Sequence, residues 1–355
     1  MSGNLSIVLH KKGDLRLEEV DYPGEPGPNE VQLDSKIVGV CGSDIHFWKD
    51  GGIDKFVVDR PTVLGHEASA VVVKVGSRVS NVRVGDRVAI EPGIACLNCQ
   101  VCKDGNYNIC PDVQFQGVPP LGGSLTRRFN LTAAFCHKLP DNISDAEGAL
   151  MEPLAVAVYA CKRANLIIGC GYKVMVTGAG PVGLLAAMSA KALGAQDVCI
   201  LDINESRLNF AKQLGISKTI LIDSKSEVSD LAKQVIDKFG GQSPHVTLEC
   251  SGAEMSINLA IHVTRDGGDV VLIGVSNNKV NVNISSAAVR QVNLLGIKRY
   301  LNTFPLAIHL VSSGELDIKP LITHTFKLED GIKAFETARD SAINGAIKVH
   351  IRCNQ

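Results

Sequence analysis

The sequence lacks long hydrophobic runs and blocks of one charge. No stretch approaches the roughly 18 uninterrupted apolar residues of a membrane span, and residues 1–8 lack the basic start and apolar segment of a secretory leader. We therefore expect a soluble, cytoplasmic protein. A net charge of −1 without a basic block argues against nucleic acid as a partner, and there is no acidic tail.

Internal repeats and low-complexity linkers are also absent. A length of 355 residues indicates two domains, and a hydrophobic content of 45% suffices for two cores. Up to about Leu139, short β-rich runs alternate with Gly, Pro and Asp, for example at residues 31–40, 70–75 and 87–90. The first part of the chain is therefore predicted to be a compact, mostly β domain.

From Tyr172 the pattern changes to strands that alternate with helices. The expected elements are strands at 174–177, 198–201, 219–222, 246–250 and 270–275, and helices at 184–193, 228–239 and 257–263. Such alternation predicts a doubly wound parallel sheet with right-handed crossovers. The stretch from about Lys298 contains one helix (304–312) and the strand-like run IKVHIRC, and we expect it to return to the first domain.

A glycine-rich turn, GAGPVG, lies between the first strand of the second part and its helix. Gly178 permits the tight turn, Gly180 lets the backbone approach a pyrophosphate, and Gly183 allows the helix to pack closely on the strand. The helix N-terminus supplies free N–H groups to the phosphates. This context predicts a Rossmann dinucleotide-binding site.

Asp202 closes the next strand, nineteen residues after Gly183. A carboxylate at this position accepts hydrogen bonds from the adenosine ribose hydroxyls and repels a 2′-phosphate, so the sequence favours NAD over NADP. The alternative is that Asp202 is only an acid at the start of the next helix.

Four of the eleven cysteines lie within fifteen residues, in CLNCQVCKDGNYNIC. In a reducing compartment, cysteines are thiols or metal ligands rather than a disulfide framework. The spacing is C-x2-C-x2-C-x7-C, and four thiolates in one lobe suit a closed tetrahedral zinc site that stabilises the fold. The expected ligands are Cys96, Cys99, Cys102 and Cys110.

Two alternatives apply to this lobe. Pro111 follows the last cysteine, as in iron–sulfur proteins, but bacterial ferredoxins have three residues before that cysteine instead of seven and a second cysteine group. A redox-active C-x-x-C would begin a helix in a thioredoxin-like unit, whereas this motif lies in a loop of a β-rich domain.

Three residues of the first part offer ligands for a second metal. Cys41, His66 and Glu67, in GVCGSDIHFW and VLGHEASA, supply a thiolate, an imidazole and a carboxylate. Three protein ligands with an open position are typical of catalytic zinc. Spacing alone leaves open a buried thiol at Cys41, a plain turn at 66–67 and a solvated acid at Glu152 in LMEPLAV, because distant ligand sets are not local motifs.

Six segments of the chain resemble the zinc-dependent medium-chain dehydrogenases, and within them the sorbitol (polyol) dehydrogenase branch. They are GHE, GDRVAIEPG, the cysteine lobe, EGALMEPLAV, VTGAGPVGLL and RYLNTFPLAI, and the resemblance covers essentially the whole chain. It implies an α/β fold with a GroES-like, mostly β catalytic domain at residues 1–154, to which 298–355 returns. The Rossmann NAD-binding domain is then expected at 155–297.

The resemblance also implies the roles of the metal ligands. Cys41, His66 and Glu67 bind a catalytic zinc together with a water, and Glu152 contacts that water and the substrate. Related alcohol dehydrogenases have a cysteine ligand in place of Glu152, so this acid favours the polyol branch. The cysteine lobe is similar to the structural zinc lobe of alcohol dehydrogenases. The implied cofactors are NAD and two zinc ions per chain, one catalytic and one structural.

Cofactor, substrate and relay residues follow from the same resemblance. The expected cofactor contacts are Gly178, Gly180, Val182, Gly183, Asp202, Arg207, Ile273, Gly274, Val275, Ile297, Lys298 and Arg299. The expected substrate contacts are Phe47, Glu152, Arg299 and Tyr300. Ser43 and His46, spaced C-x-S-x-x-H, resemble the family's proton relay from alcohol to solvent. The alternative for His46 is a surface loop histidine.

Three departures from the family pattern concern the substrate. Phe47 replaces a usual tyrosine, Ala70 replaces a glycine, and FQGVPPLGGS at 115–124 replaces FCATPPDDGN. The expected function is reversible hydride transfer from a secondary alcohol of a polyol, such as sorbitol or xylitol, to NAD, giving a ketose. The alternatives are a dehydrogenase for another secondary alcohol, of the threonine or butanediol type, and a non-catalytic NAD-binding relative. The family usually forms homotetramers, and we expect neither a nucleic acid nor a membrane partner.

Overall fold

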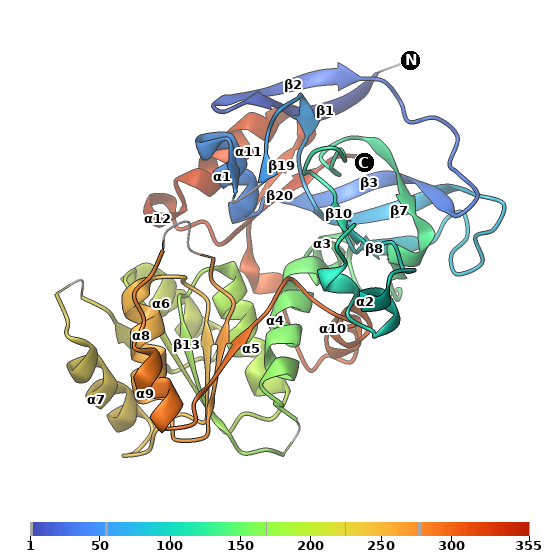
Figure 1. The fold of residues 1–355 in the computed structure, drawn as a ribbon. Helices are drawn as coiled ribbons and strands as arrows, with labels where there is room; N and C mark the ends of the chain where they lie inside the picture. Colours follow the sequence, from blue (N-terminus) through green and yellow to red (C-terminus); the bar gives the residue numbers. More distant parts are fainter. Residues whose placement is uncertain (1–2, 54–55, 168, 224, 276–278, 355) are drawn as a thin grey trace. The chain divides into compact units, whose positions relative to one another are not determined.

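The computed structural model describes residues 3–53, 56–167, 169–223, 225–275 and 279–354. These residues form two compact units (Figure 1). Unit 1 comprises Met1–Glu152 and Ala307–Gln355, and unit 2 comprises Pro153–Leu306. The domain limits expected from the sequence, at residues 154 and 297, stay a prediction; the compact units divide the chain at 152 and 306.

Unit 1 is built on a sheet whose strands come from both ends of the chain. Their order is β12-β8-β7-β3-β20-β19, and β11 also pairs with β3. The bounds are β3 Glu30–Gly39, β7 Glu67–Val75, β8 Arg87–Ile90, β11 Arg128–Thr132, β12 Cys136–Lys138, β19 Ile322–Lys327 and β20 Lys348–Arg352. In β20, His350 lies opposite Gly39 and Arg352 lies opposite Ile37, so the C-terminal strand completes the sheet of the N-terminal unit.

Smaller elements surround this sheet in unit 1. A three-stranded sheet contains β1 (Asn4–Lys11), β2 (Asp14–Val20) and β6 (Thr62–Val63), and two short ribbons pair β4 (Gly52–Ile53) with β5 (Phe56–Val57) and β9 (Gly93–Ile94) with β10 (Gln114–Phe115). The helices are α1 Gly42–Asp50, α2 Gln100–Lys103, α3 Asp145–Ala149, α11 Gly331–Arg339 and α12 Ser341–Asn344. Leu33, Ile90, Phe335 and Ile351 belong to one buried apolar core that joins residues from both ends of the chain.

Helix α1 is fixed at both ends and packs on α11. Cys41 is its N-cap, with reciprocal capping contacts to Asp44, and Gly51 ends the helix in the left-handed conformation (φ 84°). On the helix surface, Trp48 packs edge-on against Phe335 of α11 with ring centroids 6.1 Å apart. These contacts hold the first turn of α1, and therefore Cys41, at the end of β3.

Unit 2 contains a six-stranded parallel sheet in the order β15-β14-β13-β16-β17-β18. In chain order this is 3-2-1-4-5-6, the doubly wound Rossmann arrangement. The strands are β13 Lys173–Thr177, β14 Asp197–Asp202, β15 Lys218–Leu221, β16 Val246–Glu249, β17 Asp269–Leu272 and β18 Asn293–Gly296. The helices are α5 Pro181–Ala192, α6 Glu205–Gln213, α7 Val228–Lys238, α8 Glu254–Val263 and α9 Ile284–Val289. The predicted fold class, a mostly β part with a doubly wound α/β part, is confirmed.

Two helices include the residues at which the units divide. They are α4 (Met151–Arg163) and α10 (Phe304–Ser312), and α10 has the bounds that the sequence predicts. The strand predicted at 270–275 is shorter than expected, because the amides of Ile273 and Gly274 turn to the Glu249 carbonyl, at 2.8 and 2.9 Å. Strand β17 therefore ends at Leu272.

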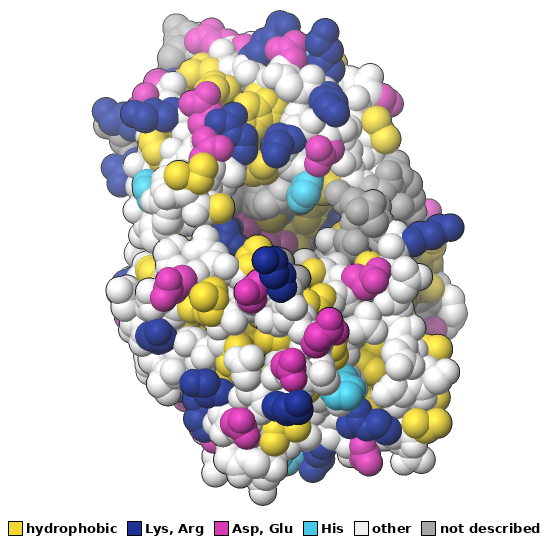
Figure 2. Space-filling model, turned by 90° about the vertical axis from the view of Figure 1, so that its left-hand side faces the viewer, with side chains coloured by type: hydrophobic (Ala, Val, Ile, Leu, Met, Phe, Trp, Pro, Cys, Tyr) yellow, Lys and Arg dark blue, Asp and Glu magenta, His cyan; other side chains and the backbone are white. Residues whose placement is uncertain are grey.

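The described surface carries mixed charge. On the face drawn in Figure 2, basic and acidic side chains are interspersed with apolar ones. Within the described ranges, no helix is both long enough and apolar enough to cross a membrane.

Candidate metal centres and cofactor site

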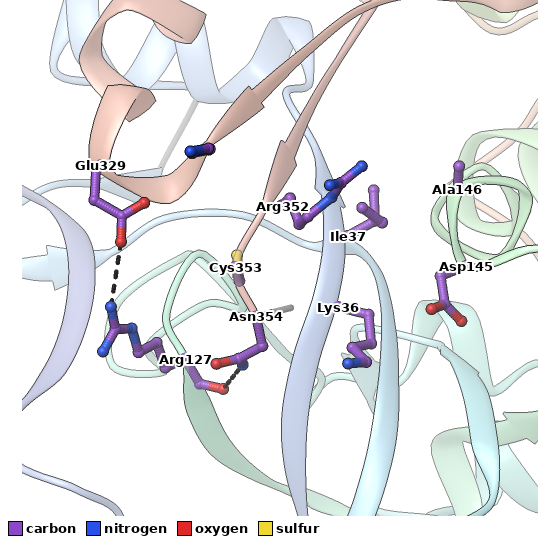
Figure 3. A pocket seen from close by; sticks show the side chains of 10 residues that line it. Lys36, Ile37, Arg127, Asp145, Ala146, Glu329, Arg352, Cys353 and Asn354 are labelled. Atoms are coloured by element: carbon purple, nitrogen blue, oxygen red, sulfur yellow. Dashed lines mark hydrogen bonds and ion pairs between the residues drawn. The ribbon is translucent and has the colours of Figure 1, made fainter. Parts of the chain in front are cut away.

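One pocket of unit 1 is separate from the predicted site. It has a volume of about 730 Å³ and is lined by charged, polar and apolar residues of β3, α3 and the C-terminal segment, together with Arg127 (Figure 3). In it, Arg127 donates to Glu329 at 3.2 Å, and the Asn354 amide donates to the Arg127 carbonyl at 2.8 Å. None of the residues predicted for the metals, the cofactor or the substrate lines this pocket.

The side chains of Cys41, His66 and Glu67 meet in one cluster. One ligand atom from each lies within 4.8 Å of the others, and His66 and Glu67 are buried. The sheet explains why residues so distant in sequence meet. Gly39, at the end of β3, lies opposite Glu67, at the start of β7. The turn that carries Cys41 therefore lies beside the turn that carries His66.

A glycine makes room for the Glu67 carboxylate. A Cβ atom on Gly39 would lie 2.2 Å from Oε2 of Glu67, so only glycine leaves this space open. A half-buried thiol and a buried imidazole and carboxylate around one point are the donor types of zinc. The three donors, and the space that Gly39 leaves for the Glu67 carboxylate, fit a zinc ion.

Asp44 orients the imidazole of His66. Its Oδ1 lies 3.5 Å from Nδ1 of His66, and its Oδ2 accepts the Cys41 amide at 3.0 Å. A carboxylate on one imidazole nitrogen fixes the tautomer so that the other nitrogen can bind metal. Burial on its own lowers the pKa of His66, but the Asp44 carboxylate and the Cys41 thiol together raise it well above its usual value. The cluster therefore favours positive charge.

Sequence reasoning missed Asp44, and it also missed Lys348 of β20. Its Nζ lies 2.8 and 2.7 Å from the two carboxylate oxygens of Glu67 and 3.5 Å from the Val40 carbonyl. Burial on its own lowers the pKa of Lys348, but Glu67 and Cys41 outweigh that cost and raise it. A lysine within the apolar run AIKVHI is the signal that could have identified it.

Glu152 is buried in the first turn of α4, outside the three-ligand cluster. Its charge contributes to raising the pKa of Lys348, so its carboxylate lies within electrostatic reach of the same group of residues. This position agrees with the proposed role of Glu152 beside the metal rather than as a fourth ligand.

The relay and substrate residues of α1 differ in their surroundings. Ser43 Oγ lies 3.4 Å from Nε2 of His66, at the metal cluster. His46 is exposed, and its Nδ1 lies 2.9 Å from Oδ2 of Asp50. Phe47 is buried and belongs to the apolar core of unit 1. Their roles in the relay and in substrate binding stay predictions.

The segment that departs from the family pattern lies against the metal cluster. The ring of Phe115 packs on the ring of His66 with centroids 5.2 Å apart. Gly117 has φ 77°, and a Cβ there would lie 3.1 Å from the Gly65 amide nitrogen. Gln116 between them is buried, and its Oε1 accepts no hydrogen bond from the described residues. The departures of this segment are therefore changes in the surroundings of the proposed zinc.

The four cysteines of the lobe also come together. The sulfurs of Cys96 and Cys110 are 3.5 Å apart, those of Cys99 and Cys110 3.9 Å, and those of Cys96 and Cys102 4.0 Å. These separations are far longer than a disulfide bond. They match the edge of a tetrahedron of sulfurs around zinc, about 3.8 Å for a zinc–sulfur distance of about 2.3 Å.

The backbone of the lobe favours a thiolate at Cys96. Leu97 has a positive φ of 54°, and the amides of Asn98 and Cys99 donate to Sγ of Cys96 at 3.5 and 3.3 Å. These hydrogen bonds lower the pKa of Cys96 to about 7. A thiolate is the form that binds metal, so the fold prepares the lobe for a cation. The geometry fits the structural zinc that the spacing predicts.

The glycine-rich turn of unit 2 joins β13 to α5. Gly178 has φ 88°, which favours glycine, and Gly180 is the N-cap of α5. A Cβ on Gly183 would lie 1.8 Å from the Gly178 carbonyl oxygen, so the helix can approach the strand only with glycine there. Val182 lies in the first turn of α5. The predicted structural reasons for Gly178 and Gly183 are therefore present, and the approach of a pyrophosphate to Gly180 stays a prediction.

Asp202 ends β14 beside this turn. Its Oδ2 accepts the Ala179 amide at 2.5 Å, and its Oδ1 accepts the Asn204 amide at 2.8 Å. Asp202 thus holds the glycine turn in place, a role that the sequence did not reveal. Glu249, at the end of β16, was also missed; it is buried and accepts the Ser251 and Gly252 amides at 2.9 and 3.0 Å.

The other predicted cofactor residues lie at the carboxyl ends of the strands, where doubly wound sheets bind ligands. Ile273, Gly274 and Val275 follow β17; Ile297, Lys298 and Arg299 follow β18; Arg207 lies in the first turn of α6. Arg299 has φ 56°, and Tyr300 is buried with its ring edge-on to Phe304 at 5.2 Å. These placements suit a dinucleotide, and the individual contacts stay predictions.

Replacement of Cys99 by serine tests the cysteine lobe. Cys99→Ser should remove one zinc per chain, and it should lower the thermal midpoint more than it lowers turnover in the surviving folded protein, because a closed site contributes folding free energy. Elemental analysis, thermal unfolding and kcat measure the three effects. Cys170→Ser is the control, since Cys170 lies outside both clusters. Unchanged zinc content in Cys99→Ser, or iron in the wild type, would contradict the assignment.

Two families match the chain. Residues 27–141 match the alcohol dehydrogenase GroES-like domain, and residues 181–313 match the zinc-binding dehydrogenase family. The sorbitol dehydrogenases of Homo sapiens and Bos taurus are 46% and 47% identical over 351 residues, which cover 99% of this chain and 96% of each relative.

Solved structures agree with this match. An oxidoreductase/dehydrogenase of unknown specificity from Escherichia coli has a TM-score of 0.91 and 32% identity, with 100% of both chains covered. The 2R,3R-butanediol dehydrogenase of Bacillus subtilis has a TM-score of 0.86 and 29% identity, covering 99% of this chain and 100% of the other. The chain therefore belongs to the zinc-containing medium-chain dehydrogenase family, as a homologue of the sorbitol dehydrogenases.

Proposed function

We propose that this protein is a zinc-dependent polyol dehydrogenase that transfers a hydride reversibly from a secondary alcohol of a polyol to NAD, giving a ketose. The observation that carries the proposal is the convergence of Cys41, His66 and Glu67, with Glu152 close by. Identity to sorbitol dehydrogenases over 99% of the chain supports sorbitol or a similar polyol as substrate. A cytoplasmic location is part of the proposal, and so is a homotetramer, the assembly that the family usually forms.

Removal of the hydroxyl proton is the first requirement of the reaction. A neutral alcohol does not ionise near pH 7, and a bound zinc ion lowers the pKa of a hydroxyl that it contacts. Cys41, His66 and Glu67 would hold that ion, while Asp44 keeps the His66 ring in the orientation that binds it. Hydride transfer then needs the reacting carbon to lie against the nicotinamide, which is a matter of positioning.

Ser43 and His46 provide a route for the proton in this proposal. Ser43 Oγ lies at the metal cluster, 3.4 Å from Nε2 of His66, so it can accept a hydrogen bond from the substrate hydroxyl. His46 is exposed on the same helix and contacts Asp50, so it can pass a proton to solvent. Ser43 is half-buried at the metal cluster and His46 is exposed, which supports this direction of transfer.

Glu152 distinguishes a polyol enzyme from a simple alcohol dehydrogenase. A buried carboxylate beside the metal can accept hydrogen bonds from a second substrate hydroxyl, which a monohydric alcohol lacks. Arg299 and Tyr300 are the proposed partners for the remaining hydroxyls.

NAD is the proposed cofactor. The Gly178–Gly183 turn offers its backbone to the pyrophosphate, and the carboxylate of Asp202 lies next to this turn. Each oxygen of Asp202 already accepts one backbone amide and retains capacity for a ribose hydroxyl, since a carboxylate has about four acceptor positions. The negative charge at this point opposes the 2′-phosphate of NADP.

A dehydrogenase for another secondary alcohol is the second candidate. The buried Phe47 offers no hydroxyl, and the 115–118 segment beside His66 departs from the family pattern. The similar structure of 2R,3R-butanediol dehydrogenase keeps this candidate open. A rate survey with NAD and NADP over sorbitol, xylitol, threitol, butanediol and threonine decides between the two. The highest kcat/KM on a polyol supports the proposal, and the highest value on butanediol or threonine replaces it.

Glu152→Gln should lower kcat on sorbitol by at least about tenfold, equivalent to about 1.4 kcal/mol of transition-state stabilisation. The substitution preserves size and most hydrogen bonding but removes the negative charge near the metal. NAD affinity should change little, because the cofactor residues are untouched. Steady-state kinetics and NAD titration measure both effects.

A second variant, Glu152→Cys, supplies the ligand that alcohol dehydrogenases have at this position. It should favour 2-butanol relative to sorbitol if the acid recognises the additional hydroxyls. Equal losses on sorbitol and 2-butanol in both variants would mean that Glu152 serves the metal alone.

Asp202→Ala should reduce the preference for NAD over NADP. The change weakens NAD binding and removes repulsion of the 2′-phosphate. The ratio of kcat/KM values for the two cofactors measures the effect, with thermal unfolding as a control because Asp202 also holds the glycine turn. A wild type that prefers NADP would contradict the ribose argument.

A further inference from the structure

Lys348 is the only lysine or arginine among the described residues that is buried. Its side chain is 3% exposed, and that of its partner Glu67 is 2% exposed. Burial of an ammonium group is costly unless a counter-charge compensates it. The carboxylate of Glu67 supplies this counter-charge, and Glu67 is a proposed zinc ligand.

The contact engages the whole carboxylate of Glu67. Nζ of Lys348 lies 2.8 Å from Oε1 and 2.7 Å from Oε2, so neither oxygen is left without this cation. The negative charges of Cys41 and Glu152 also attract Lys348. The ion pair of Lys348 with Glu67 joins Nζ to Oε2 at 2.7 Å.

The geometry of the strands fixes this arrangement. Gly39 of β3 lies between Glu67 of β7 and His350 of β20 in the sheet, and it has no side chain to separate them. Lys348 is two residues from His350 and therefore emerges on the same face of β20. The ammonium group thus reaches Glu67 across the gap that Gly39 leaves open.

Lys348 and a zinc ion cannot both interact at full strength with the carboxylate of Glu67. A zinc ion bound by Cys41, His66 and Glu67 would draw on the oxygens that Lys348 contacts, and the two positive charges repel each other. The effect of such repulsion is large in a buried site, because the surrounding protein screens it poorly. By linkage, the charge that neutralises Glu67 before zinc binds also reduces the gain when zinc binds.

We propose that Lys348 is a positioning residue that shares Glu67 with the catalytic zinc: it keeps the ligand cluster assembled without metal and weakens the hold of the site on zinc. The inference rests on the proposed zinc site but is independent of which alcohol is the substrate. The four ligands of the cysteine lobe are all cysteines, and the contacts of Lys348 are to Glu67 and Val40 instead. The two zinc ions of one chain should therefore differ in affinity, with the catalytic ion bound less tightly.

Replacement of Lys348 by methionine tests the sign of this coupling. Lys348→Met preserves chain length and removes the charge. The dissociation constant of the weaker zinc, measured by competition with a chelator, should fall by at least about tenfold. If Lys348 only orients Glu67, its loss should instead weaken zinc binding. The zinc of the cysteine lobe in the same chain is an internal reference and should not change.

Thermal unfolding supplies a second readout. In the metal-free form, Lys348→Met leaves Glu67 buried without its cation, so the thermal midpoint should fall below that of the wild type. Zinc should restore most of this loss. The difference in thermal midpoint between the zinc-bound and the metal-free form should therefore be larger in Lys348→Met than in the wild type. Lys319→Met is a matched control, because Lys319 is an exposed lysine of unit 1 that lies 3.7 Å from Glu147, outside the cluster. It should change neither zinc affinity nor this difference.

The double variant separates the pair from a general effect on folding. In a Glu67→Gln background, Lys348→Met should change zinc affinity much less, since the shared carboxylate is gone. Unchanged or weaker zinc binding in the single variant overturns the inference while the proposed function stands. A wild type that binds zinc only in the cysteine lobe overturns the proposed function, and this inference with it.

Discussion

The buried ion pair between Glu67 and Lys348 is the contact around which unit 1 is organised. It joins the start of β7 to a strand 281 residues later, over a glycine in β3 that leaves room for the carboxylate. Without the return of the C-terminal strand, the buried Glu67 carboxylate would lose the ammonium group of Lys348 that pairs with it. The catalytic cluster therefore depends on both ends of the chain.

The two proposed metal centres follow opposite principles. The cysteine lobe is local: four ligands within fifteen residues, with backbone amides directed at Cys96 and a turn at Leu97 that places them. Such a site contributes folding free energy to a segment in which most residues are exposed. The cluster of Cys41, His66 and Glu67 is non-local, two of its three members are buried, and the charged side chains of Asp44 and Lys348 contact it. The closed lobe suits a structural zinc ion. The three-ligand cluster suits a catalytic zinc ion with one coordination position open to water or substrate.

The sequence predicted what local patterns determine. The strand–turn–helix context identified the glycine turn, the cysteine spacing identified the lobe, and the alternation of apolar segments identified the parallel sheet. It could not identify Asp44 and Lys348, because their partners are determined by the register of β3, β7 and β20. Asp202 shows the same limit: its position after β14 suggested a ribose contact, while its hydrogen bond to Ala179 exists only because the two strands are adjacent. Phe47 is a substrate contact by resemblance, and its side chain belongs to the buried core of unit 1, so this role stays a prediction.

The central claim is that Cys41, His66 and Glu67 bind zinc at a site distinct from the cysteine lobe. The most direct test is a crystal structure with anomalous diffraction measured on both sides of the zinc absorption edge. The account predicts two zinc peaks per chain. One should lie about 2.0–2.3 Å from the sulfur of Cys41, a nitrogen of His66 and an oxygen of Glu67, and the other about 2.3 Å from all four sulfurs of the lobe. A zinc-loaded crystal with a peak only in the lobe would contradict it.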